Sequence, residues 1–67
     1  MITRIICEYK YDDKMMRLAV VSNNGKDYMQ FQVYGCEMDA WFDATYIINI
    51  NEHYAYVMRK LFNDGKV

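Results

Sequence analysis

Three consecutive segments of this chain alternate between apolar and polar residues, and this alternation constrains the fold more than any other feature. The segments are residues 3–11, 15–22 and 28–35, and they are rich in β-branched and aromatic side chains. A period of two with such residues is typical of a strand that buries one face. Each segment therefore predicts a strand.

Short polar turns separate the three predicted strands. Residues 12–14 (DDK) join the first two, and residues 22–27 (SNNGKD) join the second and third. Asn-Gly between two alternating runs strongly indicates a hairpin, because both residues tolerate positive φ. The three strands are therefore predicted to form an antiparallel meander.

The alternation also predicts which side chains share a face. One face is expected to be core, with Ile6 as an exception to the pattern; its residues are Ile5, Cys7, Tyr9, Tyr11, Met16, Leu18, Val20, Met29, Phe31 and Val33. The opposite face is expected to carry Arg4, Glu8, Lys10, Arg17, Tyr28, Gln30, Gln32 and Tyr34.

Residues 51–65 predict a helix. Its apolar side chains recur at i, i+3, i+4, i+7 and i+8, which forms one stripe; they are Tyr54, Val57, Met58, Leu61 and Phe62. Asn51 is expected to cap the start of the helix, and Gly65 to end it in the αL conformation.

The segment between Cys36 and Ile50 has two readings. Met38, Trp41 and Phe42 fit a single helical turn, whereas alternation from residue 42 to 50 fits a strand. We expect a long fourth strand that begins near Ala40 and leads into the helix. The predicted fold is α+β, in the order β-β-β-β-α, with the helix packed on one face of a four-stranded antiparallel sheet. At 67 residues, we expect residues 1–67 to form a single small domain.

Composition excludes several classes of function. The net charge is −1, so no global basic surface favours nucleic acid. No apolar run is long enough to span a membrane, and charged residues interrupt the N-terminal segment too early for a signal peptide. We therefore expect a cytoplasmic protein without membrane contact, in which Cys7 and Cys36 are reduced and behave as small apolar residues.

No motif indicates catalysis, a metal or a cofactor. Zinc normally takes about four Cys or His ligands, but this chain has two distant cysteines and one histidine, His53. We expect His53 to be a solvated helix residue rather than a general base. The chain has no nucleophile elbow and no phosphate-binding loop. The sequence therefore predicts that the protein is not an enzyme.

Eight residues are candidates for binding a partner. They are the polar and aromatic side chains of the third strand, with the acidic and aromatic residues that follow it: Tyr28, Gln30, Gln32, Tyr34, Glu37, Asp39, Trp41 and Asp43. Trp and Tyr are frequent interface anchors, and the acids suit a basic partner surface. Three alternatives remain open: an ordinary solvated face, a stacking platform for single-stranded nucleic acid, and, for the acids, a cation site that lacks EF-hand spacing.

We therefore expect a small non-enzymatic protein-binding module that self-associates, for example as a homodimer. The alternative is a small nucleic-acid-binding regulator that uses the aromatic sheet face. No motif identifies a family. In size and composition alone, the chain is similar to small proteins of bacteriophages and mobile elements, including anti-CRISPR inhibitors. This likeness implies an inhibitor of the anti-defence or host-takeover type, which occludes the surface of an unidentified partner protein.

Overall fold

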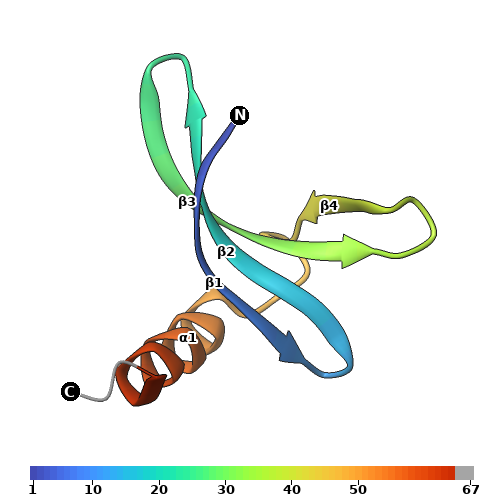
Figure 1. Ribbon diagram of the computed structural model, residues 1–67, viewed down its shortest axis with the longest axis vertical. Helices are drawn as coiled ribbons and strands as arrows, with labels where there is room; N and C mark the ends of the chain where they lie inside the picture. Colours follow the sequence, from blue (N-terminus) through green and yellow to red (C-terminus); the bar gives the residue numbers. More distant parts are fainter. Residues whose placement is uncertain (65–67) are drawn as a thin grey trace.

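The fold is a four-stranded antiparallel sheet followed by one helix, as Figure 1 shows. The computed structural model describes residues 1–64. The strands are β1 (Ile2–Tyr11), β2 (Lys14–Asn23), β3 (Lys26–Gly35) and β4 (Ala40–Asp43), in the spatial order β1-β2-β3-β4, and the helix is α1 (Ile50–Asp64). The predicted α+β class and the order β-β-β-β-α are confirmed.

Two tight hairpins set the register of the first three strands. The two central residues have positive φ in both turns: 53° and 63° at Asp12 and Asp13, and 54° and 78° at Asn24 and Gly25. Positive φ at both central residues defines the type I′ turn, whose twist matches that of the flanking strands. The Asn-Gly hairpin predicted from the sequence is thus present.

Two bulges in β1 change which side chains face the core. The pairing with β2 shifts once between Ile2 and Arg4 and again between Ile5 and Cys7. Ile5 therefore pairs with Ala19 and turns away from the core, although alternation placed it inside. Arg4 pairs with Val20 on the core side, and its predicted position on the opposite face is also wrong. An extra residue in one strand reverses the alternation beyond it, and Ile6, the exception in the sequence pattern, is that residue.

The fourth strand is shorter than predicted, because it ends at Asp43. Ala44 is fully buried, and its N–H donates to the carbonyl of Phe31 at 2.9 Å. The Asp43 carboxylate accepts a hydrogen bond from the Thr45 N–H at 2.8 Å. Such a side-chain contact satisfies the backbone in a turn and competes with strand pairing. Residues 45–48 consequently form a turn rather than continuing the strand.

The helix begins one residue earlier than predicted. Asn49, not Asn51, is its N-cap, because its Oδ1 accepts from the Glu52 N–H at 3.1 Å. The predicted C-terminal stop, Gly65, lies outside the described residues.

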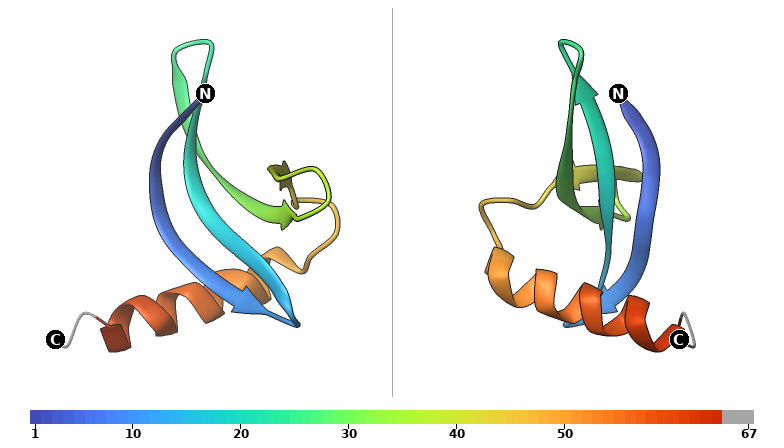
Figure 2. Two further views of the ribbon diagram at one scale, coloured as in Figure 1. Left: turned by 45° about the vertical axis from the view of Figure 1, so that its right-hand side comes forward. Right: turned by 90° about the vertical axis from the view of Figure 1, so that its left-hand side faces the viewer.

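Helix α1 crosses only one end of the sheet, as both views in Figure 2 show. The predicted stripe is therefore partly wrong: Val57 is fully buried, but Met58 and Phe62 are 51% and 66% exposed. At the other end of the same sheet face, Met29 is 51% exposed, although it was expected in the core.

The core lies where the helix meets the sheet. Its buried members come from β1, β2, β3, the residue after β4, and α1: Cys7, Tyr9, Met16, Leu18, Phe31, Ala44 and Val57. The other cysteine, Cys36, is exposed in the turn after β3, so the expectation that both cysteines pack as apolar residues holds only for Cys7. Within residues 1–64, no helix is long and apolar enough to cross a membrane.

Candidate functional site

The sheet face that points away from α1, called here the second face, contains most of the predicted binding residues. Cross-strand pairing arranges them in rows, because directly paired residues share a face. From the N-terminal end of β1 these rows are Ile2–Val21–Tyr28, Ile5–Ala19–Gln30, Glu8–Arg17–Gln32–Asp43 and, between β3 and β4 alone, Tyr34–Trp41.

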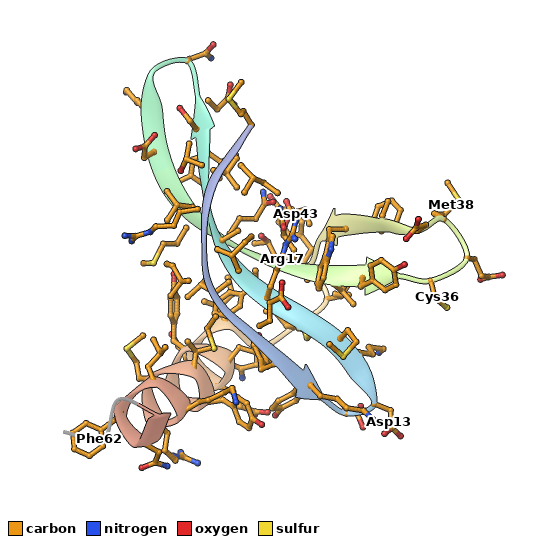
Figure 3. The ribbon with its side chains drawn as sticks, in the orientation of Figure 1. Asp13, Arg17, Cys36, Met38, Asp43 and Phe62 are labelled. Carbon is orange, nitrogen blue, oxygen red and sulfur yellow. The ribbon has the colours of Figure 1, made fainter. Side chains whose placement is uncertain are left out.

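Arg17 and Trp41 form the centre of a packed cluster on the second face. The guanidinium carbon of Arg17 lies 4.2 Å from the centroid of the Trp41 ring, which is a cation–π contact. Tyr34 packs against the same indole, with 5.3 Å between ring centroids. In Figure 3, Arg17 and Asp43 lie near the middle of the sheet, whereas Cys36 and Met38 lie at the far end of the β3–β4 hairpin. The cluster therefore fixes this hairpin against β2.

A chain of polar contacts continues from Arg17 along β3. Its Nε donates to Oε1 of Gln32 at 2.7 Å, and Nε2 of Gln32 donates to Oε1 of Gln30 at 2.8 Å. Gln32 is only 6% exposed, so this buried amide needs those partners. Gln32 thus contributes to the fold as well as to the surface, and it cannot contact a partner with most of its area.

The acidic candidates lie around the β3–β4 hairpin. The Tyr34 hydroxyl donates to the carboxylate of Asp39, and this hydrogen bond raises the pKa of Tyr34. Glu37 is exposed in the turn between the two strands. Hydrogen bonds from Thr45 lower the pKa of Asp43. In the described part of the chain, no three His, Cys, Asp or Glu side chains gather closely enough to hold a metal ion.

The opposite end of the second face is apolar. Tyr28 is 45% exposed, and Ile2 and Ile5 are 42% and 37% exposed. Ala19 and Val21 lie between them on β2, in the same rows, and are buried. Tyr28 therefore stands apart from the Arg17–Trp41 cluster, in a patch with Ile2 and with Ile5, which the bulge at Ile6 turns toward this face.

His53 is buried, so the expectation of a solvated side chain is wrong. It is 4% exposed, and its Nδ1 lies 2.8 Å from the hydroxyl of Tyr9. Burial lowers the pKa of His53 and raises that of Tyr9 to about 12, so the imidazole is neutral and the hydroxyl keeps its proton. His53 lies three residues after Ile50 and four residues before Val57. This helical spacing is the sequence signal that places it on the buried side of α1.

Three residues of the apolar patch and the packed cluster on the second face were not among the sequence candidates: the exposed Ile2 and Ile5, and Arg17. Alternation placed Arg17 on the second face, but only the register of three strands brings it over Trp41.

Comparisons with known proteins find no matching family model, no similar curated protein and no similar solved structure.

Proposed function

We propose that the second face binds a partner protein in the cytoplasm and that the protein acts as a non-enzymatic inhibitor by covering the partner's surface. The observation that carries this proposal is the combination of an exposed apolar patch with a pre-packed aromatic cluster on one sheet face. The patch consists of Ile2, Ile5 and Tyr28, and the cluster of Arg17, Tyr34 and Trp41.

The apolar patch has the composition of an interface core. Exposed aliphatic and aromatic side chains beside one another are a recognised sign of a partner site. Tyrosine offers a large rigid area with a polar tip at low entropic cost. Ala19 and Val21 lie on β2 between these side chains and are buried, so the patch is continuous across β1, β2 and β3.

Charge defines the chemistry of the partner. Three exposed carboxylates lie around the β3–β4 hairpin, at Glu37, Asp39 and Asp43. They favour a partner that presents an apolar patch bordered by basic residues.

The same charges disfavour the nucleic-acid alternative. Phosphate binding needs available cations, but Arg17 is engaged by Trp41 and Gln32. Arg4, which was expected to add positive charge here, pairs with Val20 on the other face. Two exposed lysines remain on this face: Lys10, beside Glu8, and Lys26, at the end of β3 next to the Asn24–Gly25 turn.

Neighbouring positions of β3 provide a matched test. A photo-crosslinking amino acid replaces Tyr28 in one variant and Met29 in another; the two side chains are similarly exposed but lie on opposite faces. We expect position 28 to crosslink one protein in cells of the source organism and position 29 not to do so. Tyr28→Ala should then weaken binding of that purified protein about tenfold or more, and Met29→Ala should leave it unchanged.

Two results would contradict the proposal. Equal crosslinking from both positions, or from neither, removes the second face as the interface. Binding of a single-stranded oligonucleotide at low salt that is lost in Trp41→Ala would instead support the nucleic-acid alternative.

A further inference from the structure

The turn at residues 45–48 presents two large side chains to solvent from a fixed base. Ala44 anchors it in the core, and the Ile47 N–H donates to the carbonyl of Ala44 at 3.1 Å. Tyr46 is 94% exposed, the highest value among the large apolar and aromatic side chains of the described residues, and Ile47 is 66% exposed. Neither side chain is fully packed against the rest of the fold, and the hydrogen bond to Ala44 holds the backbone of the turn.

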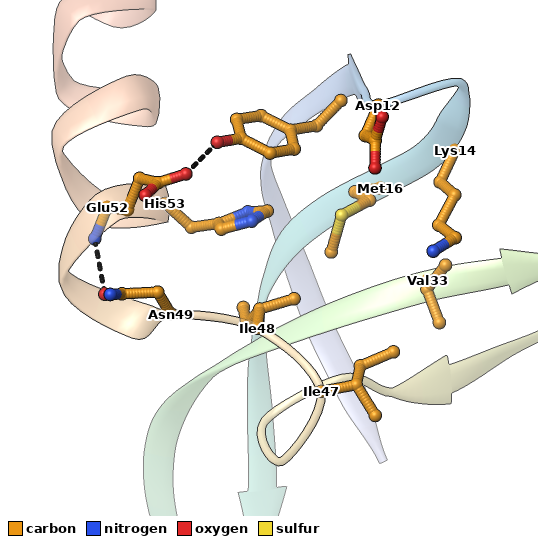
Figure 4. A pocket seen from close by; sticks show the side chains of 10 residues that line it. Asp12, Lys14, Met16, Val33, Ile47, Ile48, Asn49, Glu52 and His53 are labelled. Carbon is orange, nitrogen blue, oxygen red and sulfur yellow. Dashed lines mark hydrogen bonds between the residues drawn. The ribbon is translucent and has the colours of Figure 1, made fainter.

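A pocket of about 200 Å³ opens beside this turn, between the start of α1 and the β1–β2 hairpin. Figure 4 shows its apolar wall, formed by Met16, Val33, Ile47 and Ile48. Sites for drug-sized ligands are typically about 300–1,000 Å³. This pocket is smaller, and its volume suits one large side chain.

His53 supplies a hydrogen-bonding ring nitrogen to the pocket that it lines. The ring extends from α1 toward Met16 and Val33 in Figure 4. The Tyr9 hydroxyl and Nδ1 share a hydrogen bond of 2.8 Å in which either atom can be the donor, so Nε2 of the neutral ring donates when Nδ1 accepts and accepts when Nδ1 donates. In residues 1–64 every fully buried side-chain nitrogen or oxygen has a hydrogen-bond partner. The hydrogen bond of His53 is made by Nδ1, so Nε2 is not fully buried. Nε2 is therefore accessible to solvent, and His53 lines the pocket.

We propose that a second copy of this chain docks here, with Tyr46 of each copy inserted into the pocket of the other and its hydroxyl hydrogen-bonded to Nε2 of His53. Tyr46 directly precedes Ile47, which lines the pocket, so a two-fold axis close to this turn brings each Tyr46 to the mouth of the other pocket. The reciprocal insertion of the two Tyr46 side chains also covers Ile47 of each copy.

Other exposed aromatic side chains fit the pocket less well. Phe42 and Phe62 have no hydroxyl to meet His53. Tyr28 has one, but it lies on the opposite side of the sheet from the pocket, so it cannot be exchanged reciprocally about a two-fold axis at the pocket.

The size of the contact implies a weak dimer. A buried tyrosine removes about 150–250 Å² from water. Two such insertions, together with the contact between the adjoining turns, bury an area at or below the low end for specific interfaces. That low end is roughly 1,200 Å² in total. The expected dissociation constant is therefore micromolar or weaker, and dimerisation should depend on concentration.

Analytical ultracentrifugation of the full chain, from low micromolar to low millimolar concentration, tests this proposal. We expect a monomer–dimer equilibrium for the wild type and at least about tenfold weaker association for Tyr46→Ala. Tyr46→Phe keeps the ring and loses the hydroxyl, so it should weaken association about fivefold. Because Tyr46 is almost fully exposed, these variants should fold as the wild type does. Tyr28→Ala is the matched control and should dimerise normally, which separates this inference from the proposed function.

Ring-nitrogen NMR of His53 provides the second readout. We expect the Nε2 resonance of the wild type to shift with protein concentration, and that of Tyr46→Ala to stay constant. p-Cresol, a model of the tyrosine side chain, should compete with dimerisation and reproduce the shift in Tyr46→Ala. A wild type that stays monomeric, a Tyr46→Ala variant that dimerises normally, or p-cresol that binds without reducing dimerisation would each overturn the proposal.

Discussion

At the scale of single residues, burial of His53 makes stability depend on pH. Folding lowers the pKa of this side chain below its ordinary value of 6.5, chiefly through desolvation. As the pH falls below 6.5, the unfolded chain therefore binds a proton more readily than the folded one. The free energy of unfolding should be highest above pH 6.5. It should decline as the pH falls from 6.5 toward the lower pKa that His53 has in the folded state.

Urea unfolding at pH 7.5, 6.5, 5.5 and 5.0 measures this effect. The decline should not exceed about 1.4 kcal/mol per pH unit, the limit for one proton. His53 is the only histidine, and carboxylates titrate mainly below this range. In His53→Gln the dependence should disappear between pH 7.5 and 5.0. An equal decline in that variant would assign the effect to another group.

At the scale of elements, the start of α1 depends on one side chain. The Asn49 side chain accepts the Glu52 N–H, which has no partner within the helix. Asn49→Ala should therefore lower the free energy of unfolding by about 1 kcal/mol. Asn51→Ala is the matched control, because Asn51 lies inside the first turn and is exposed; its effect should be close to zero. Equal losses in the two variants, measured by urea denaturation, would contradict the assignment of Asn49 as the cap.

At the scale of the whole molecule, the core is small and each buried side chain matters. A protein of 67 residues is expected to have a total stability of roughly 3–10 kcal/mol. Leu18 is fully buried, so Leu18→Ala should cost about 2–5 kcal/mol. A large part of that variant should be unfolded at 37 °C, as thermal denaturation followed by circular dichroism would reveal. Met29→Ala, at a position 51% exposed, should change stability by less than about 1 kcal/mol. Similar losses of stability in Leu18→Ala and Met29→Ala would mean that the core extends beyond the end of the sheet that α1 covers.

The small core and the exposed side chains have the same origin. One helix covers only one end of one sheet face, so the remainder of both faces is open (Figure 2). Apolar residues consequently remain exposed on the second face, at residues 45–48 and along α1, for example Ile2, Ile47 and Phe62. The two proposed binding sites use the first two of these regions.

Local patterns in the sequence were sufficient for the elements and their order. Alternation identified three strands, Asn24 and Gly25 identified a hairpin, and the 3.6-residue period identified α1. These features depend on residues close together in the chain, whose backbone preferences and spacing act without distant contacts. The same patterns correctly placed Gln30 and Tyr34 on a face away from the core.

Tertiary structure decided which side chains are buried and which meet. The bulges in β1 depend on pairing with β2, so alternation alone placed Ile5 on the wrong face. The end of β4 depends on the anchoring of Ala44 beneath Phe31, and the burial of His53 depends on where α1 crosses the sheet. The contact between Arg17 and Trp41 needs the register of β2, β3 and β4 together. Each of these features joins residues far apart in the chain, so local sequence preference could not determine them.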